Sequence, residues 1–247
     1  LAGSVLAGSG AFAFELNQGN FYGAISGAES GDPGPGGTYT LVGNIDIAKV
    51  NDGNPPTGTT VFGNFTGSLD GNGKTISNLT TPLFDTIDVG GSVSNIQLET
   101  DPDGLSGRGI LANVNYGTVD EVTVSGKLDG GAADFVGGLV GENLGTIQRS
   151  TSNVEVESSG AITGGLVGYS NGLISNSSAS GDVNGITYVG GLVGWVLNFD
   201  GIESSIINSS ASGSVIASGN YAGGLVGKSD GEISGSSASG SVTGSNY

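Results

Sequence analysis

The pentapeptide Gly-Gly-Leu-Val-Gly occurs four times in this chain, and this repetition constrains the fold more than any other feature. The copies begin at Gly137, Gly164, Gly190 and Gly223, so the intervals are 27, 26 and 33 residues. Self-similarity with a period of 20–50 residues is typical of repeat architectures, in which each unit buries its apolar face only against a neighbouring copy. The sequence therefore predicts an elongated, stacked molecule whose functional surfaces lie along its length.

Aligning the chain on this motif and its degenerate upstream copies gives three columns of apolar residues. The first column is Leu83, Ile110, Leu139, Leu166, Leu192 and Leu225. The second is Val93, Val119, Ile147, Ile174, Ile206 and Ile233. The third, read from Gly-x-Val, is Val183, Val215 and Val242. Turn pairs such as Asn171-Gly172 and Asp230-Gly231 separate the first two columns.

Three short strands with three turns fit one coil of about 27 residues, so we predict an all-β fold, a β-solenoid or parallel β-helix. A β-sandwich or barrel has similar turn spacing, but it does not explain why one pentapeptide recurs in phase. Stacking explains it, because like residues then lie over like residues at about 4.8 Å. We expect Leu166, Ile174 and Val183 to point inward, on three parallel sheets.

Composition limits the function. The net charge is −17 with only six basic residues, which argues against nucleic acid and against anionic membranes as partners. The chain has no cysteine and no histidine, so disulfides, thiolate nucleophiles and imidazole ligands are excluded. We expect neither a cofactor nor a bound metal.

The first residues bear on localisation. Leu1–Phe14 is apolar, but it lacks a basic start and is too short to span a bilayer. The chain begins at Leu1 without an initiator methionine. We interpret this segment as a mature N-terminus beyond a removed signal, and we expect an extracellular or cell-surface protein without membrane insertion.

Two stretches, GGLVGYSNGLISNSSASGDV (Gly164–Val183) and GGLVGKSDGEISGSSASGSV (Gly223–Val242), resemble the GLUG-motif repeats of bacterial and archaeal surface proteins. Tyr39–Lys49 and Phe65–Thr80 are similar to the region that leads into such repeats. The resemblance implies an adhesin, a haemagglutinin-like protein, a surface-layer component or an accessory region of a secreted peptidase. It carries no catalytic residue.

We expect the chain to divide into three parts. Residues 1–38, which fall outside the resemblance, form an apolar N-terminal segment that acts as a cap or a donated strand, residues 39–82 form lead-in coils, and residues 83–247 form the GLUG-type solenoid.

Several acidic groups are candidates for chemistry. The segments Asp70–Lys74 and Asp101–Gly104 resemble calcium loops, but the first has a lysine at a ligand position, and we expect both to be turns. Close carboxylate pairs, which glycosidases use, occur at Asp85/Asp88, Asp120/Glu121 and Glu155/Glu157. Glu155 and Glu157 alternate with valines and should share an outward face. We interpret these carboxylates as solvated surface and expect no catalytic residues.

Four Asn-x-Ser/Thr sequons mark candidate glycosylation sites at Asn64, Asn78, Asn176 and Asn208. The alternative is a polar ladder on an exposed sheet. Asn176 and Asn208 occupy the same phase in neighbouring coils, so glycans there would line one face.

The coil with the 33-residue interval carries six extra residues, which we assign to a turn holding Trp195–Phe199. Insertions in solenoids lie on one face, often the binding face, so Trp195 and Phe199 are interface candidates. The alternative is a local apolar cap over a wide turn.

The two ends supply the remaining interface candidates. Phe12, Phe14 and Leu16 alternate and would fall on one face of a strand, and Tyr247 lies just beyond the third column of the last repeat. The N-terminal strand would either cap its own solenoid or add to a neighbouring subunit, which would give a head-to-tail homopolymer.

The sequence thus predicts a non-catalytic extracellular structural protein, a self-assembling subunit of a filament, sheath or surface layer. One alternative is the stalk or binding segment of an adhesin that recognises a glycan or another surface protein. The other is the accessory domain of a secreted hydrolase.

Overall fold

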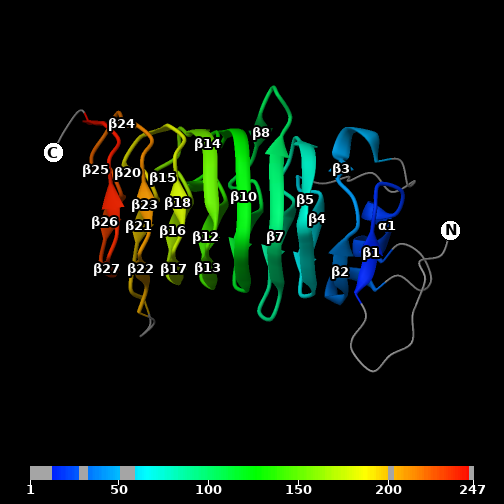
Figure 1. The fold of residues 1–247 in the computed structure, drawn as a ribbon. Coiled ribbons are helices and arrows are strands. Elements are labelled where there is room, and N and C mark those ends of the chain that lie inside the picture. Colours follow the sequence, from blue (N-terminus) through cyan, green and yellow to red (C-terminus); the bar gives the residue numbers. More distant parts are fainter. Residues whose placement is uncertain (1–12, 28–32, 51–58, 200–202, 245–247) are drawn as a thin grey trace.

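The computed structural model of the protein describes residues 13–27, 33–50, 59–199 and 203–244. These residues form an all-β solenoid of about eight turns spaced roughly 27 residues apart, which confirms the predicted fold class. The coils follow one another along a single axis from the N-terminal to the C-terminal end (Figure 1).

The described strands form three sheets, and every pairing between them is parallel. The seven-stranded sheet contains β4 (Phe62–Phe65), β6 (Phe84–Ile87), β9 (Ala112–Asn115), β12 (Val140–Asn143), β16 (Val167–Ser170), β21 (Val193–Val196) and β26 (Val226–Ser229). The four-stranded sheet contains β11 (Phe135–Gly137), β15 (Ile162–Gly164), β20 (Tyr188–Gly190) and β25 (Ala222–Gly223).

The large sheet has 18 strands. In the first half of the chain these are β1 (Phe14–Leu16), β2 (Thr38–Leu41), β3 (Ile45–Asp46), β5 (Ser68–Leu79), β7 (Ser92–Thr100), β8 (Leu105–Ser106) and β10 (Thr118–Asp129). In the second half they are β13 (Thr146–Gln148), β14 (Thr151–Glu157), β17 (Leu173–Ser175), β18 (Ser178–Ala179), β19 (Val183–Gly185), β22 (Ser205–Ile207), β23 (Ser210–Ala211), β24 (Val215–Ala217), β27 (Glu232–Ser234), β28 (Ser237–Ala238) and β29 (Val242–Gly244).

The second predicted column is confirmed residue by residue. From Val93 to Ile233 each member pairs with the next in register. The structure extends the column upstream through Leu69, Tyr39 and Phe14. Stacking these side chains fills a narrow core, in which Leu166, Ile174 and Val183 are fully buried as predicted.

Two details of the predicted columns are wrong. Leu111, and not Ile110, lies in line with Leu139, because Ala112 pairs with Val140; both Ile110 and Leu111 are buried. The three columns also do not lie on three separate sheets. Columns two and three belong to the large sheet, because β10 contains both Val119 of column two and Leu128, which lines up with Val183 of column three through Val156. The leucine of the motif instead lies at the corner between the four-stranded and seven-stranded sheets.

A column of left-handed residues bends the large sheet between columns two and three. The residues at this bend have φ between 49° and 61°: Asn95, Glu121, Arg149, Asn176, Asn208 and Gly235. The residue that follows the bend is a buried or partly buried serine in the later coils: Ser150, Ser177, Ser209 and Ser236. Each serine Oγ donates to the carbonyl two residues earlier, at 2.8–3.0 Å. It also accepts the N–H of the same position one coil earlier, at 3.0–3.2 Å. This ladder satisfies backbone groups that the bend removes from strand pairing.

The glycines of the repeated motif allow two sheets to pack backbone against backbone. A Cβ atom on Gly168 would lie 2.5 Å from the Val136 nitrogen and 2.7 Å from the Gly141 oxygen. A Cβ atom on Gly164 would lie 2.0 Å from the Val167 oxygen. No side chain fits in this contact, so the motif marks the coils in which the four-stranded sheet covers the seven-stranded one.

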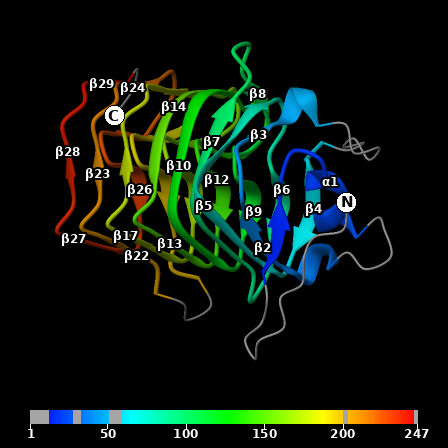
Figure 2. The ribbon, with the colours of Figure 1, turned by 45° about the vertical axis from the view of Figure 1, so that its right-hand side comes forward.

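A short helix, α1 (Phe21–Ser26), covers the N-terminal end of the core (Figure 2). Phe21 lies edge-on to Phe62, with ring centroids 5.3 Å apart, and is fully buried. The 3₁₀ helices η1 (Gly34–Gly36) and η2 (Ile47–Lys49) complete this end. Strand β1 pairs with β2 of the same chain, and Leu16 is fully buried, so residues 14–16 extend their own solenoid.

We expect Leu166→Ala to lower the free energy of unfolding by about 2–5 kcal/mol, because it empties part of a core that cannot collapse between two rigid coils. Urea denaturation measures this loss. Ile216→Ala removes as many carbon atoms from a side chain that is 50% exposed, and it serves as the control. Equal losses for the two variants would contradict the stacked core.

Gly168→Ala tests the contact between the two sheets. We expect a loss of about 1–3 kcal/mol, because the added methyl group has no space. Gly63 occupies the same position in the seven-stranded sheet, at β4, and a Cβ there would meet no atom within 4 Å. Gly63→Ala should therefore have little effect, and similar melting temperatures for the two variants would contradict this account of the motif.

Candidate interaction surface

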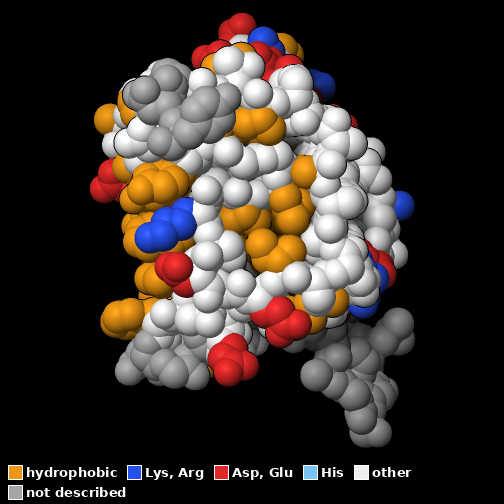
Figure 3. Space-filling model, turned by 90° about the vertical axis from the view of Figure 1, so that its left-hand side faces the viewer, with side chains coloured by type: hydrophobic (Ala, Val, Ile, Leu, Met, Phe, Trp, Pro, Cys, Tyr) orange, Lys and Arg blue, Asp and Glu red, His pale blue; other side chains and the backbone are white. Residues whose placement is uncertain are grey.

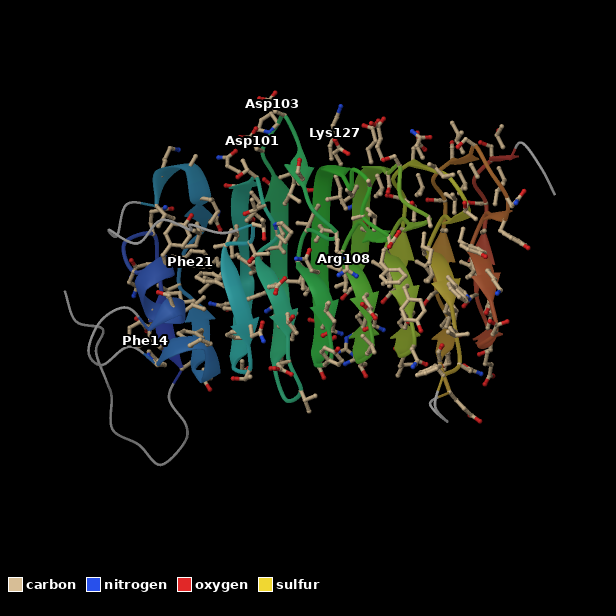
Figure 4. The ribbon with its side chains drawn as sticks, turned by 180° about the vertical axis from the view of Figure 1, so that it is seen from behind. Phe14, Phe21, Asp101, Asp103, Arg108 and Lys127 are labelled. Atoms are coloured by element: carbon tan, nitrogen blue, oxygen red, sulfur yellow. The ribbon has the colours of Figure 1, made fainter. Side chains whose placement is uncertain are left out.

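Of the two acidic segments that resemble calcium loops, one is a strand bulge and the other is a turn. The segment Asp70–Lys74 is a bulge within β5 and not a hairpin-like turn, and Asn72 there has φ of 50° and donates its N–H to Asp70 Oδ1 at 2.7 Å. Asp101 and Asp103 form the predicted turn, at the tip of the projection between β7 and β8 (Figure 4). Within the described ranges, no group of three or more Asp, Glu, His or Cys side chains could hold a metal ion.

Two of the three close carboxylate pairs take part in surface ion pairs, whereas Asp85 of the third accepts a hydrogen bond from Asn113 Nδ2 at 2.9 Å. Glu155 and Glu157 lie exposed on β14, as predicted, and Glu155 pairs with Lys127 at 3.5 Å. Arg149 binds both Asp120 and Glu121, the latter at 3.0 Å. Such exposed pairs contribute little to stability.

The four sequon asparagines differ in their surroundings. Asn64, Asn176 and Asn208 are exposed, and the last two lie on the left-handed bend in neighbouring coils. Asn78 is partly buried, and its Nδ2 donates to Asp46 Oδ1 at 2.7 Å. Hydrogen bonds from Lys49 and then Asn78 hold the pKa of the Asp46 carboxyl below its usual value, so this carboxylate remains an acceptor for Asn78.

The predicted interface residues do not lie together. Phe12 and Tyr247 are outside the described residues, Leu16 is buried, and Phe14 is partly buried against Tyr39 at the N-terminal end (Figure 4). Phe199 lies in the predicted insertion and is 63% exposed. Trp195 does not lie in that turn, which is a correction. It is on β21 in register with Tyr169, because the extra residues fall between Val196 and Ser205.

The structure brings Trp195 into a surface that we call the aromatic strip. Its members are Phe135, Tyr169, Tyr188, Trp195 and Tyr221. Tyr188 is stacked between Trp195 and Tyr221, with centroid distances of 5.4 and 5.0 Å. Tyr169 meets Trp195 edge-on at 5.9 Å and Phe135 at 5.2 Å. The strip therefore runs continuously over four coils of the seven-stranded and four-stranded sheets.

Charged side chains flank the strip at both ends. Arg108 lies 5.5 Å from the Phe135 ring and pairs with Glu142 at 3.4 Å (Figure 4). Lys228 Nζ lies 4.6 Å from the Trp195 ring centroid. Burial, with a smaller effect of Glu142, raises the pKa of the Tyr169 phenol, so Tyr169 is neutral at ordinary pH. Hydrophobic and basic side chains accordingly lie next to each other along one edge of the end view (Figure 3).

The positions of the aromatic residues relative to the repeated motif are a sequence signal for this strip. Phe135, Tyr188 and Tyr221 each stand two residues before a copy of the motif, and Tyr169 and Trp195 each follow one directly. Tyr221 also has φ of 63°, a strained value for an aromatic residue, and its side chain is 53% exposed. Strain retained at an exposed aromatic residue is typical of functional surfaces.

The geometry is that of a repeat protein with an aromatic strip along its side. Segments 159–184, 185–216 and 218–243 match the family described as the GLUG motif. The second half of the β-solenoid thus carries GLUG repeats, as the sequence predicted. Residues 21–126 match a second family, described as the M26 IgA1-specific metallo-endopeptidase N-terminal region.

Known proteins extend these matches. Halomucin of Haloquadratum walsbyi is 38% identical over 223 residues, an alignment that covers 78% of this chain and 2% of halomucin. The chain thus spans only about 2% of the length of that relative. A crystal structure described as a proposed immunoglobulin A1 protease from Bacteroides ovatus matches with a TM-score of 0.62 and 18% identity, over 92% of this chain and 84% of that one. At this identity the likeness shows the fold alone.

The helices of the described segments do not include one that is long and apolar enough to cross a membrane.

We expect the exposed sequons to be modified selectively when the protein is produced in cells that glycosylate Asn-x-Ser/Thr sites. Asn64, Asn176 and Asn208 should carry glycan, whereas the amide of Asn78 is held by Asp46. Peptide mass spectrometry measures the occupancy of each site. Asn→Gln variants at each position serve as controls, and high occupancy at Asn78 alone would contradict the expectation.

Proposed function

We propose that this chain is a non-catalytic, extracellular structural segment that acts as a stiff rod on a cell surface. The observation that carries the proposal is the continuous parallel stack, in which each coil is held by backbone hydrogen bonds and by apolar and serine ladders. Such a stack resists bending because every inter-coil contact is repeated in phase along the axis.

The surface and the relatives support this role. A net charge of −17 keeps the rod soluble and repels like-charged surfaces. The GLUG repeats and the similarity to halomucin favour a structural protein outside the cell.

A finer version of the proposal is head-to-tail self-assembly into a filament, sheath or surface layer. The last described coil leaves Ile233 41% and Val242 45% exposed, and hydrophobic side chains are visible at this end (Figure 3). In this version the outer side of the coil accepts a further coil, which pairs with it as it pairs with the coil before it. In the assembled form, this further coil belongs to the next subunit.

A second candidate is the accessory region of a secreted peptidase. The match of residues 21–126 to the M26 N-terminal region favours it. In this role the rod would hold a separate catalytic domain at a distance and would again perform no chemistry itself.

Negative-stain microscopy of native material distinguishes these roles. Regular filaments or a lattice would support the assembling rod. Rods that each end in a globular domain would support the accessory region of a peptidase, and flexible or compact particles would contradict both.

The purified chain should hydrolyse neither glycans nor peptides, and its melting temperature should not change when EDTA is added. The reason is that the described residues hold no group of three metal-ligating side chains, and that Glu155 and Glu121 are held in exposed ion pairs. Differential scanning calorimetry with and without EDTA, and assays with and without added Zn²⁺ or Ca²⁺, test this. A melting temperature that falls on chelation, or turnover that depends on the metal, would overturn the proposal of a non-catalytic rod.

A further inference from the structure

The last four positions of the outward column of the seven-stranded sheet begin and end with opposite charges. In register from coil to coil, the column reads Glu142, Tyr169, Trp195 and Lys228. When the same column of a second copy runs beside it in the opposite direction, Lys228 lies opposite Glu142 and Trp195 lies opposite Tyr169. The column is therefore complementary to a reversed copy of itself.

The neighbouring column of the four-stranded sheet has the same property. It reads Phe135, Ile162, Tyr188 and then Tyr221, which stacks on Tyr188. Reversal places Phe135 opposite Tyr221, so aromatic side chains meet there, whereas Ile162 is buried and lies below the contact. Both columns run through the same four coils in the same order. A single two-fold axis therefore aligns both of them with the matching columns of the second copy.

We propose that the aromatic strip binds a second copy of this chain, with the two solenoids side by side and antiparallel. The two-fold axis lies in the plane of contact, perpendicular to the solenoid axis, and passes between the coils of Tyr169 and Trp195. Glu142 of each copy then faces Lys228 of the other. This contact is isologous and closed, unlike the head-to-tail contact at the ends of the rod.

The composition of the strip fits such an interface. Tyrosine, tryptophan and phenylalanine are enriched in the centres of protein interfaces, and charged groups lie at the rim. Lys228 is 4.0 Å from its neighbour Asp230 within the chain, which is the limit for an ion pair, so its ammonium group is available to a partner carboxylate. Glu142 is shared with Arg108 at 3.4 Å, a contact that also leaves room for a second cation.

The dimer should be weak because the strip is short. Four coils span only about 19 Å at about 4.8 Å per coil, which gives a contact at the small end of interface sizes. The rigid backbone lowers the ordering cost, so we expect a dissociation constant of about 10–100 μM. Where many copies are held together on a surface, many such contacts form at once. The affinity of each single contact can then be low.

Sedimentation velocity of the full chain at about 0.15 M salt tests the proposal, since the Debye length of about 8 Å there leaves close pairs intact. The mass should double with rising concentration. The emission of Trp195, the single tryptophan of the chain, should shift to shorter wavelength over the same range as its ring leaves water.

Charge reversal identifies the surface. Lys228→Glu alone and Glu142→Lys alone should each raise the dissociation constant by about 100-fold or more, because each places like charges opposite one another twice per dimer. The double variant should recover dimerisation. Lys127→Glu is the matched control, because Lys127 is exposed on the large sheet, where it pairs with Glu155. Circular dichroism and melting curves confirm that each variant is folded.

A chain that stays monomeric up to about 1 mM overturns the proposal. A dimer that is unchanged by both single reversals overturns it too, because the contact then lies elsewhere. Neither result affects the proposed rod, which microscopy and hydrolysis assays test separately.

Discussion

Parallel pairing between successive coils is the interaction on which the rest of the structure depends. Each coil places its backbone about 4.8 Å from the same position of the next, so every side chain must tolerate a neighbour of its own kind. Isoleucine over isoleucine meets this condition in the core, as Ile147, Ile174 and Ile206 show. Serine over serine meets it at the bend, where each Oγ joins two coils. The repeated sequence is the direct consequence of this constraint.

The glycines of the repeated motif reflect a second constraint, which is the close packing of two sheets backbone against backbone. Beside the four-stranded sheet, Gly168 has no space for a Cβ atom, whereas a Cβ atom on Gly63, at the equivalent position of β4, would meet no atom within 4 Å. The same contact brings the outward residues of two sheets into one surface. Tyr169 and Phe135 lie on different sheets, yet their rings are 5.2 Å apart. The aromatic strip therefore exists because the two sheets pack without intervening side chains.

The two ends of the described solenoid differ, and this difference bears on how rods of this kind are joined. At the N-terminal end, α1 buries Phe21 against Phe62 and covers the core. At the other end, Ile233 and Val242 remain partly exposed in the last described coil. Because the coils pair in parallel and follow one another in chain order, the rod has a direction. Side-by-side pairing through the strip reverses that direction, so longitudinal and lateral contacts impose different symmetries on an assembly.

The solenoid, the length of its coil and the second and third columns were determined by the sequence alone. Stacking places like residues in the same phase of successive coils, and the spacing from Ile147 to Ile174 records that phase directly. Spacing does not record which positions face each other across sheets. The register of Leu111, the strand position of Trp195 and the hydrogen bond that holds Asn78 were therefore decided only by the tertiary structure. The tertiary structure also decided the aromatic strip. Its charged side chains and rings come together only where two sheets meet at a corner, and the repeat spacing does not describe that corner.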